Sequence, residues 1–308
     1  MLSRPHLVLC FGCSAGLWVA LPIGLLAGCG SESTESNAGA SAPTTTSSHG
    51  GSGATGGGGQ AGAGGQTGGG GGGHAGGGGQ GGASTAAGSI VPLYSYPDDP
   101  SWNAIIAAKA AHPTVTVQAI INPDSGPGQS ADALFAQGIS SLAGAGIVVL
   151  GYVATTYAAK PAADAHAEID AYQAWYPDLS GIFFDEMESS AGSEAYYSEL
   201  TAYAKGLGFT LTVGNPGTDV AASYVGTVDT MFIYESAGLP DVASLGGWHT
   251  GYDPRNFGII PYAVPSLDGA FVAQARANVG FVYLTGDDLP NPWDTLPAYF
   301  SDLLAALE

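Results

Sequence analysis

From residue 90 onward the chain alternates short apolar blocks with longer stretches that are rich in alanine. The apolar blocks contain many β-branched and aromatic side chains, which is typical of strands that are buried on both faces. Strands are therefore predicted at 90–95, 115–121, 147–153, 181–184, 209–214, 228–234, 257–263 and 279–284. The alanine-rich stretches predict helices at 101–111, 131–144, 162–176, 193–207, 219–224, 268–277 and 297–307, and the helix after the sixth strand is poorly defined.

This alternation predicts parallel strands joined by right-handed helical crossovers. Eight such units close a (β/α)8 TIM barrel of about 200–250 residues, which fits the span 89–308. The alternative is an open, doubly wound sheet, whose nucleotide sites follow the first strand with a glycine-rich loop. The sequence has Tyr94-Ser95-Tyr96-Pro97 at that place, and the barrel is therefore favoured.

Residues 30–88 are largely Gly, Ala, Ser, Thr and Gln, with unbroken glycine runs at 56–59 and 68–73. Such a segment has too few large apolar side chains to form a core, which predicts a disordered tether over 29–88. A flexible chain of this length has a root-mean-square span of about 40–46 Å. The barrel is thus expected to stand well clear of whatever holds the start of the chain.

The first 28 residues resemble a bacterial lipoprotein signal. An apolar stretch over 7–26 follows Arg4 and ends in Leu26-Ala27-Gly28-Cys29, which matches a lipobox. The resemblance implies cleavage before Cys29, lipidation of that cysteine and anchoring to the cell envelope, at the outer membrane or the cell surface. The alternative is an uncleaved transmembrane anchor, since about 20 apolar residues can span a bilayer. The complete lipobox favours the lipoprotein.

The cysteine, histidine and charge content of the chain argues against disulfides, metal sites and nucleic-acid partners. Cys10 and Cys13 lie in the signal, so Cys29 is the only cysteine of the expected mature chain, and no internal disulfide is available. The scattered histidines lack metal-ligand spacing, and neither a metal nor a cofactor is expected. With 26 acidic and 6 basic residues, a net charge of −20 excludes nucleic acid as a partner. It is compatible with a neutral or cationic polymer, or simply with solubility.

The strongest candidates for catalysis are carboxylates at two predicted strand ends. Asp185 and Glu186 end the run 181–186, and Glu235 follows the sixth strand. Glycoside hydrolysis needs one protonated carboxylic acid and one carboxylate, and active groups of a TIM barrel gather at the carboxyl ends of its strands. Adjacent acids on a strand point to opposite sides, so only one of the pair is expected to face the barrel axis. The alternative is a capping acid or one paired with a lysine.

Aromatic and amide residues at the other strand ends are typical of sugar sites, since rings stack on pyranoses and amides bind hydroxyls. The candidate substrate-binding residues are Tyr94, Asn122, Tyr152, Asn215, Tyr262 and Asp287. Structural alternatives stay open for some of them. Asp287 with Asp288 also fits a solvated turn, and Asn215-Pro216-Gly217 also fits a turn. Outside this set, Trp248 and His249 fit stacking on a sugar and equally fit packing at the barrel rim, and Asp170 fits a helix surface better than a catalytic role.

Six motifs together resemble the spherulin-4 family over essentially all of 89–308. They lie at 91–94, 121–123, 125–128, 151–155, 181–186 and 215–218. The family is similar to glycoside hydrolases of family 135, whose fungal members cleave α-1,4-linked N-acetylgalactosamine in galactosaminogalactan. The resemblance implies a (β/α)8 barrel in which the essential acids correspond to Asp185, Glu186 and Glu235.

On this basis we expect a surface-tethered, monomeric, endo-acting and retaining glycosidase that cleaves a hexosamine-containing exopolysaccharide. An α-linked 2-acetamido sugar places its acetamido group on the wrong face for neighbouring-group attack, so retention needs a protein nucleophile. We assign Asp185 as nucleophile, Glu235 as general acid/base and Glu186 as support, with exchange of Asp185 and Glu186 left open. The alternatives are a non-catalytic cell-surface or spore-coat glycan-binding protein, and a glycosidase for another sugar or linkage.

Overall fold

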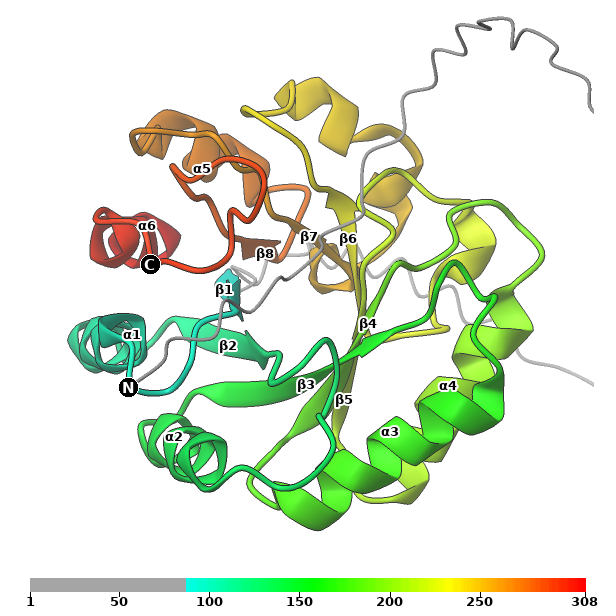
Figure 1. The fold of residues 1–308 in the computed structure, drawn as a ribbon. Coiled ribbons are helices and arrows are strands. Elements are labelled where there is room, and N and C mark those ends of the chain that lie inside the picture. The colour runs from blue at the N-terminus through cyan, green and yellow to red at the C-terminus, as the bar shows by residue number, and fades with distance from the viewer. Residues whose placement is uncertain (1–86) are drawn as a thin grey trace, which may run out of the picture. The chain divides into compact units, whose positions relative to one another are not determined.

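The computed structural model describes residues 87–308, which form a closed barrel of eight parallel strands in sequence order (Figure 1). Each strand pairs with the next, and β1 pairs with β8 to close the ring. The predicted TIM barrel is therefore confirmed, and the open sheet is excluded. The predicted signal peptide, the lipidation site at Cys29 and the tether up to residue 86 lie outside the described residues.

The strands are short and almost entirely buried. They are β1 (Gly88–Leu93), β2 (Thr116–Ile121), β3 (Val148–Ala154), β4 (Gly181–Asp185), β5 (Leu211–Gly214), β6 (Thr230–Tyr234), β7 (Phe257–Ile259) and β8 (Phe281–Val282). The last two strands are shorter than predicted, because Pro261 has no N–H to donate and the ladder becomes irregular there. Hydrogen bonds still link the two segments, since the Tyr283 N–H lies 3.0 Å from the Ile259 carbonyl oxygen.

Six α-helices surround the barrel. They are α1 (Pro100–Ala111), α2 (Ala133–Gly144), α3 (Ala162–Trp175), α4 (Glu194–Gly206), α5 (Gly269–Ala275) and α6 (Phe300–Leu307). The helix predicted at 219–224 is only a 3-10 turn, η1 (Ala222–Tyr224), because so short a segment barely nucleates an α-helix. Among the described residues no helix has the length and apolar character needed to cross a bilayer.

The connection after β6 contains three short 3-10 segments in place of an α-helix. They are η2 (Val242–Leu245), η3 (Gly247–Gly251) and η4 (Pro254–Asn256). Glycines and prolines recur through this stretch of sequence, and both residue types disfavour a continuous helix. The poor definition of this helix in the sequence therefore reflects a real irregularity of the fold.

Aspartates fix the start of several helices. Asp99 accepts a hydrogen bond from the Ser101 N–H, and Pro100 occupies the first turn, where its missing N–H is harmless. Asp132 and Asp268 cap α2 and α5 in the same way. Part of the acidity of this chain is thus structural, since these side chains satisfy backbone N–H groups that the helix leaves unpaired.

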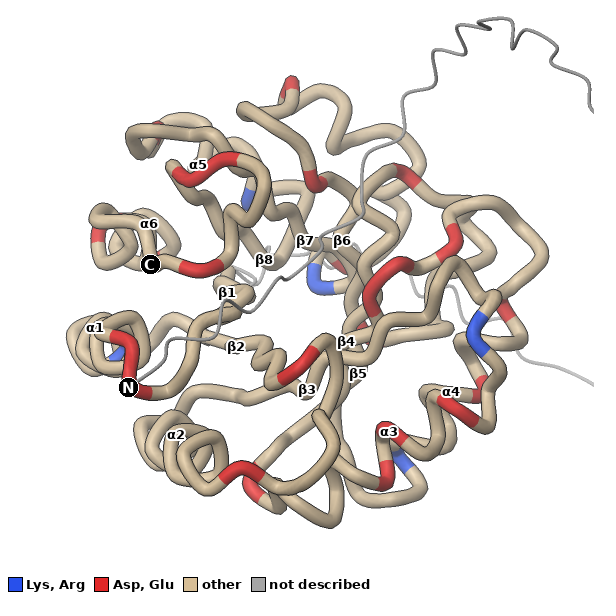
Figure 2. Tube along the Cα trace, in the orientation of Figure 1, with Lys and Arg blue, Asp and Glu red and all other residues tan. Residues whose placement is uncertain are grey.

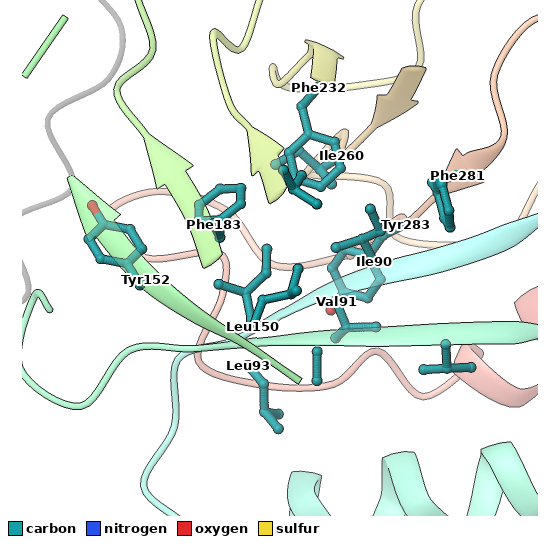
Figure 3. Packing of buried hydrophobic residues seen from close by; sticks show 14 of the residues in the cluster. Ile90, Val91, Leu93, Leu150, Tyr152, Phe183, Phe232, Ile260, Phe281 and Tyr283 are labelled. Carbon is teal, nitrogen blue, oxygen red and sulfur yellow. The ribbon is translucent and has the colours of Figure 1, made fainter. Parts of the chain in front are cut away.

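Aromatic side chains fill the interior beneath the strand ends (Figure 3). The rings of Tyr152 on β3 and Phe183 on β4 are 5.9 Å apart, and Phe183 lies 5.9 Å from Phe232 on β6. Outside the barrel, α3 packs closely on β3, because a Cβ on Gly151 would lie 2.9 Å from the ring of Tyr172. These contacts hold β3, β4 and β6 in fixed relation, and the candidate acids follow directly on two of them.

Candidate active site

Asn215 joins Asp185, the last residue of β4, to Glu235, which follows β6. Its side-chain nitrogen lies 2.8 Å from Oδ1 of Asp185 and 2.6 Å from Oε2 of Glu235. Because one atom contacts both, these two oxygens are at most about 5.4 Å apart. The amide nitrogen carries two hydrogens, so it donates one to each carboxyl group. Asn215 follows β5, between the two acid-bearing strands, and is only 7% exposed.

Glu235 has the character of a proton donor. Burial and the negative charge of Asp185 raise its pKa from the ordinary 4.5 to about 7, against hydrogen bonds from Asn215 and Trp293 that lower it. A carboxyl group with a pKa near 7 is protonated in a substantial fraction of molecules at neutral pH. It can therefore deliver a proton to a leaving group and later take one back.

Asp185 receives more hydrogen bonds than Glu235 does. Burial raises its pKa as well, but hydrogen bonds from the Tyr152 side chain, the Glu186 backbone and Asn215 act in the opposite direction. The charge of Asp185 in turn raises the pKa of Glu235. When Asp185 is ionised, its charge thus favours the protonated form of Glu235, which leaves one carboxylate beside one carboxylic acid.

Glu186 faces different partners from its neighbour. Its backbone is left-handed, with φ at 51°, and its carboxylate accepts hydrogen bonds from the backbone and side chain of Thr156. Burial and the charge of Asp185 raise the pKa of Glu186, and the nearby Lys160 opposes them. Asp185 and Glu186 therefore have different surroundings, although β4 ends at Asp185 and Glu186 lies beyond it, so this difference does not come from the alternation of side chains along a strand.

The loop after β3 is bonded directly to these two acids. The buried hydroxyl of Thr155 donates to the carbonyl oxygens of Asp185 and Glu186, at 2.8 and 2.9 Å. It also lies 3.1 Å from the Tyr197 hydroxyl, which accepts a hydrogen bond from the backbone N–H of Glu188. The carboxyl end of β4 is thus held by buried hydroxyl groups on one side and by Asn215 on the other.

Three of the predicted sugar-binding tyrosines belong to the same cluster. The Tyr94 ring packs edge-on against Tyr152 at 5.7 Å, and the Tyr262 ring packs edge-on against Trp293 at 6.2 Å. The backbone N–H of Tyr94 donates to the carbonyl oxygen of Trp293 at 2.9 Å. The Tyr152 side chain is hydrogen-bonded to Asp185, and the Trp293 side chain is hydrogen-bonded to Glu235. This aromatic cluster therefore contacts both acids.

The other predicted ligands have partners within their own loops. Oδ1 of Asn122 accepts a hydrogen bond from the Gly126 N–H at 2.9 Å. Asp287 accepts one from the Thr295 hydroxyl, and Asp288 accepts one from the Leu289 N–H, as in a turn. Binding of a sugar by Asn122 or Asp287 stays a prediction.

Other residues considered from the sequence have structural surroundings. His249 is buried, with Nδ1 at 2.7 Å from the Gly246 carbonyl and Nε2 at 3.0 Å from Asp219, and its ring packs edge-on against Phe257. Asp170 on α3 accepts a hydrogen bond from Tyr203 at 2.8 Å. These contacts agree with rim packing and with a helix surface.

Trp293 is the site residue that the sequence prediction missed. It follows Asn291-Pro292 in the segment between β8 and α6, is almost fully buried, and donates a hydrogen bond to Glu235. Trp293 lies five positions after Asp288, the last carboxylate of the predicted eighth strand end. A tryptophan in the last loop of a barrel is the signal that could have identified it.

Metal binding has no ready ligand set in the part of the chain that the structure describes. No group of three or more His, Cys, Asp or Glu side chains there is arranged to hold a metal ion. The clustered chemistry at the strand ends consists of the two carboxyl groups and their amide, phenol and indole donors.

Known proteins share this barrel. Residues 89–307 match the model of the spherulation-specific family 4. The chain is 38% identical to Spherulin-4 of Physarum polycephalum over 233 residues, which cover 71% of this chain and 69% of that protein. The crystal structure of Aspergillus clavatus Sph3 in complex with GalNAc matches with a TM-score of 0.64 at 27% identity, covering 72% of this chain and 97% of that chain.

Proposed function

The chain belongs to the spherulation-specific family 4, and on that premise we propose that it is a glycoside hydrolase acting on a hexosamine-containing polysaccharide. The observation that carries the proposal is the shared amide of Asn215, which holds Asp185 next to Glu235, whose pKa is raised to about 7 by burial and by the charge of Asp185. A pair of carboxyl groups with separated pKa values is what acid-assisted glycoside cleavage requires.

The proposed substrate is a chain of α-1,4-linked N-acetylgalactosamine or galactosamine. The Aspergillus clavatus structure that this barrel resembles contains GalNAc, which supports an amino sugar. The negative net charge of the protein is compatible with the same class of polymer. Acidic positions are spread around the barrel and basic ones are few (Figure 2), so a neutral or cationic polymer is tolerated and a polyanion is repelled.

The proposed mechanism retains the anomeric configuration. The facing oxygens of Asp185 and Glu235 are at most about 5.4 Å apart, a limit that is compatible with the separation of about 5–5.5 Å in retaining enzymes and lies below the roughly 6.5–9.5 Å of inverting ones. Glu235 protonates the glycosidic oxygen while Asp185 attacks the anomeric carbon, which forms a glycosyl ester and releases the shortened chain. Glu235 then takes a proton from water, whose oxygen displaces Asp185.

The location of the enzyme is proposed from the sequence. The lipobox around Cys29 supports a lipid anchor in a bacterial envelope, and the glycine-rich tether would let the barrel reach polymer away from the membrane. Metabolic labelling with a radioactive fatty acid tests this proposal. Labelling of the wild-type chain that is lost in Cys29→Ala would support it, and equal labelling of both would refute it.

The test of the activity is depolymerisation by the full-length protein in detergent micelles. N-acetylated and de-N-acetylated α-1,4-galactosaminan are incubated with the wild type, Asp185→Asn and Glu235→Gln, and new reducing ends and product sizes are measured. We expect cleavage by the wild type and loss of at least about 10³-fold in both variants. Binding of polymer without new reducing ends would instead indicate a glycan-binding protein, and unchanged cleavage by the variants would refute the assigned acids.

A further inference from the structure

The loop after β3 contains an unusual backbone. Three consecutive residues with side chains, Thr156, Tyr157 and Ala158, are left-handed, with φ at 51°, 53° and 63°. A Cβ makes this region unfavourable, so left-handed residues other than glycine normally occur singly. Strained backbone of this kind persists where the surroundings enforce it, and it clusters at functional sites.

The surroundings that enforce this turn belong to the strand that carries Asp185. The Tyr157 N–H donates to the carbonyl oxygen of Glu186 at 2.7 Å, and the Glu186 carboxylate accepts hydrogen bonds from Thr156. Within the loop, the Ala159 N–H bonds the Thr156 carbonyl at 2.9 Å, and the Lys160 N–H bonds the Thr155 carbonyl at 3.1 Å. Glu186 thus holds the turn through both its backbone and its side chain.

The turn exposes a large aromatic ring at the edge of the candidate site. Tyr157 is 50% exposed, among the most exposed of the large hydrophobic residues in the described chain. Its backbone N–H is bonded to the carbonyl oxygen of Glu186, the residue after Asp185, so this turn lies at the carboxyl end of β4, beside the candidate acids. A half-exposed tyrosine offers both aromatic surface and a hydroxyl group, which suits it to contact with a pyranose.

We propose that Tyr157 is a stacking platform for a sugar ring of the substrate beside the cleaved bond, and that Glu186 is the positioning residue that fixes this platform. This inference rests on the proposed function, because it assumes that a glycan occupies the strand ends. It gives Glu186 a role without contact to the reacting atoms, which agrees with its separation from the amide that joins Asp185 and Glu235.

Steady-state kinetics on α-1,4-linked N-acetylgalactosamine oligosaccharides test the platform. Replacing the ring in Tyr157→Ala should raise KM by about three- to tenfold and change kcat less than about twofold, since stacking acts on bound substrate and transition state alike. Tyr157→Trp should restore KM to within about twofold of the wild type. Tyr252→Ala is the matched control, because Tyr252 is 42% exposed but precedes the amino end of β7, and its KM should not change.

Glu186 is tested in a double-mutant cycle with Tyr157. Glu186→Ala should raise KM in the wild-type background, and this effect should shrink to less than about twofold in Tyr157→Ala, because the platform is then already absent. Glu186→Gln keeps an oxygen that can accept from Thr156 and should rescue most of the KM. A loss of kcat that is equal in both backgrounds would overturn the positioning role.

Direct binding separates this inference from the proposed function. The same oligosaccharides are titrated calorimetrically into the full-length wild type, Tyr157→Ala and Tyr157→Gly. Glycine suits the left-handed backbone, so Tyr157→Gly should melt no lower than Tyr157→Ala and still bind at least about threefold more weakly than the wild type. Weaker binding in a protein that cleaves nothing supports the platform while refuting hydrolysis. Wild-type affinity and KM in both variants would overturn the platform, whether or not the protein is a hydrolase.

Discussion

Glu235→Gln should stabilise the folded protein at alkaline pH and leave its stability unchanged in acid. The pKa of Glu235 is raised from the ordinary 4.5 to about 7, chiefly by burial and then by the charge of Asp185. The folded chain therefore binds the Glu235 proton more tightly than the unfolded chain does. Stability consequently falls as pH rises from about 4.5 to about 7, and it levels off above that range.

The size of this effect follows from the two pKa values. The difference between 4.5 and about 7 corresponds to roughly 3 kcal/mol, at about 1.4 kcal/mol for each pH unit. A domain of this size loses about 2–4 °C in Tm per kcal/mol. Glutamine keeps the shape and an acceptor oxygen but does not ionise, so Glu235→Gln should gain about 6–12 °C over the wild type at pH 8.

The assay is thermal unfolding of both proteins at pH 4.5 and pH 8, with Asp178→Asn as control. Asp178 lies exposed in the loop between α3 and β4, and its replacement should give the same small difference at both values of pH. Glu235→Gln should match the wild type at pH 4.5 and exceed it at pH 8. A gain of equal size at both pH values, or none at pH 8, would show that ionisation of Glu235 is not penalised in the fold.

Three further predictions concern the surroundings of the acids and the barrel wall. Asn215→Ala removes the donor shared by both acids, so kcat/KM should fall by about 100-fold or more and the pH–rate profile should move to higher pH; an unchanged profile would refute the bridging role. Trp293→Phe removes a hydrogen bond that lowers the pKa of Glu235, so the alkaline limb of the pH profile of kcat/KM should move to higher pH. A move of this limb to lower pH would contradict the prediction. Gly151→Ala places a methyl group against the ring of Tyr172 and should lower the free energy of unfolding in urea by about 1–3 kcal/mol. An unchanged free energy of unfolding would show that α3 shifts freely to make room.

The barrel was predictable because its strands are buried on both faces and therefore read as continuous apolar blocks. Once the strands are placed, topology brings Asp185, Asn215 and Glu235 together, since they follow the consecutive parallel strands β4, β5 and β6. The exact ends of β7 and β8 were not predictable. They depend on how Pro261 interrupts a ladder, which the apolar pattern does not record.

Two features of the site depend on contacts between distant segments and were missed for that reason. Trp293 lies in the last loop of the barrel and contacts Glu235, 58 positions earlier in the sequence, and no local sequence pattern predicts this contact. The left-handed turn over 156–158 contains no glycine or asparagine, the usual signals for such a backbone. It is imposed by bonds to Glu186, so only the assembled β3 and β4 reveal it.

The assignment of roles follows from the number and kind of donors around each acid. Asp185 receives hydrogen bonds from Tyr152, from the Glu186 backbone and from Asn215, so its anion is stabilised within a buried site. Glu235 receives them from Asn215 and Trp293 and also feels the charge of Asp185, which favours its protonated form. Glu186 shares none of the donors of this pair. Exchange of roles between Asp185 and Glu186 would require Glu186 to leave Thr156 and reverse its backbone, which disfavours Glu186 as the nucleophile.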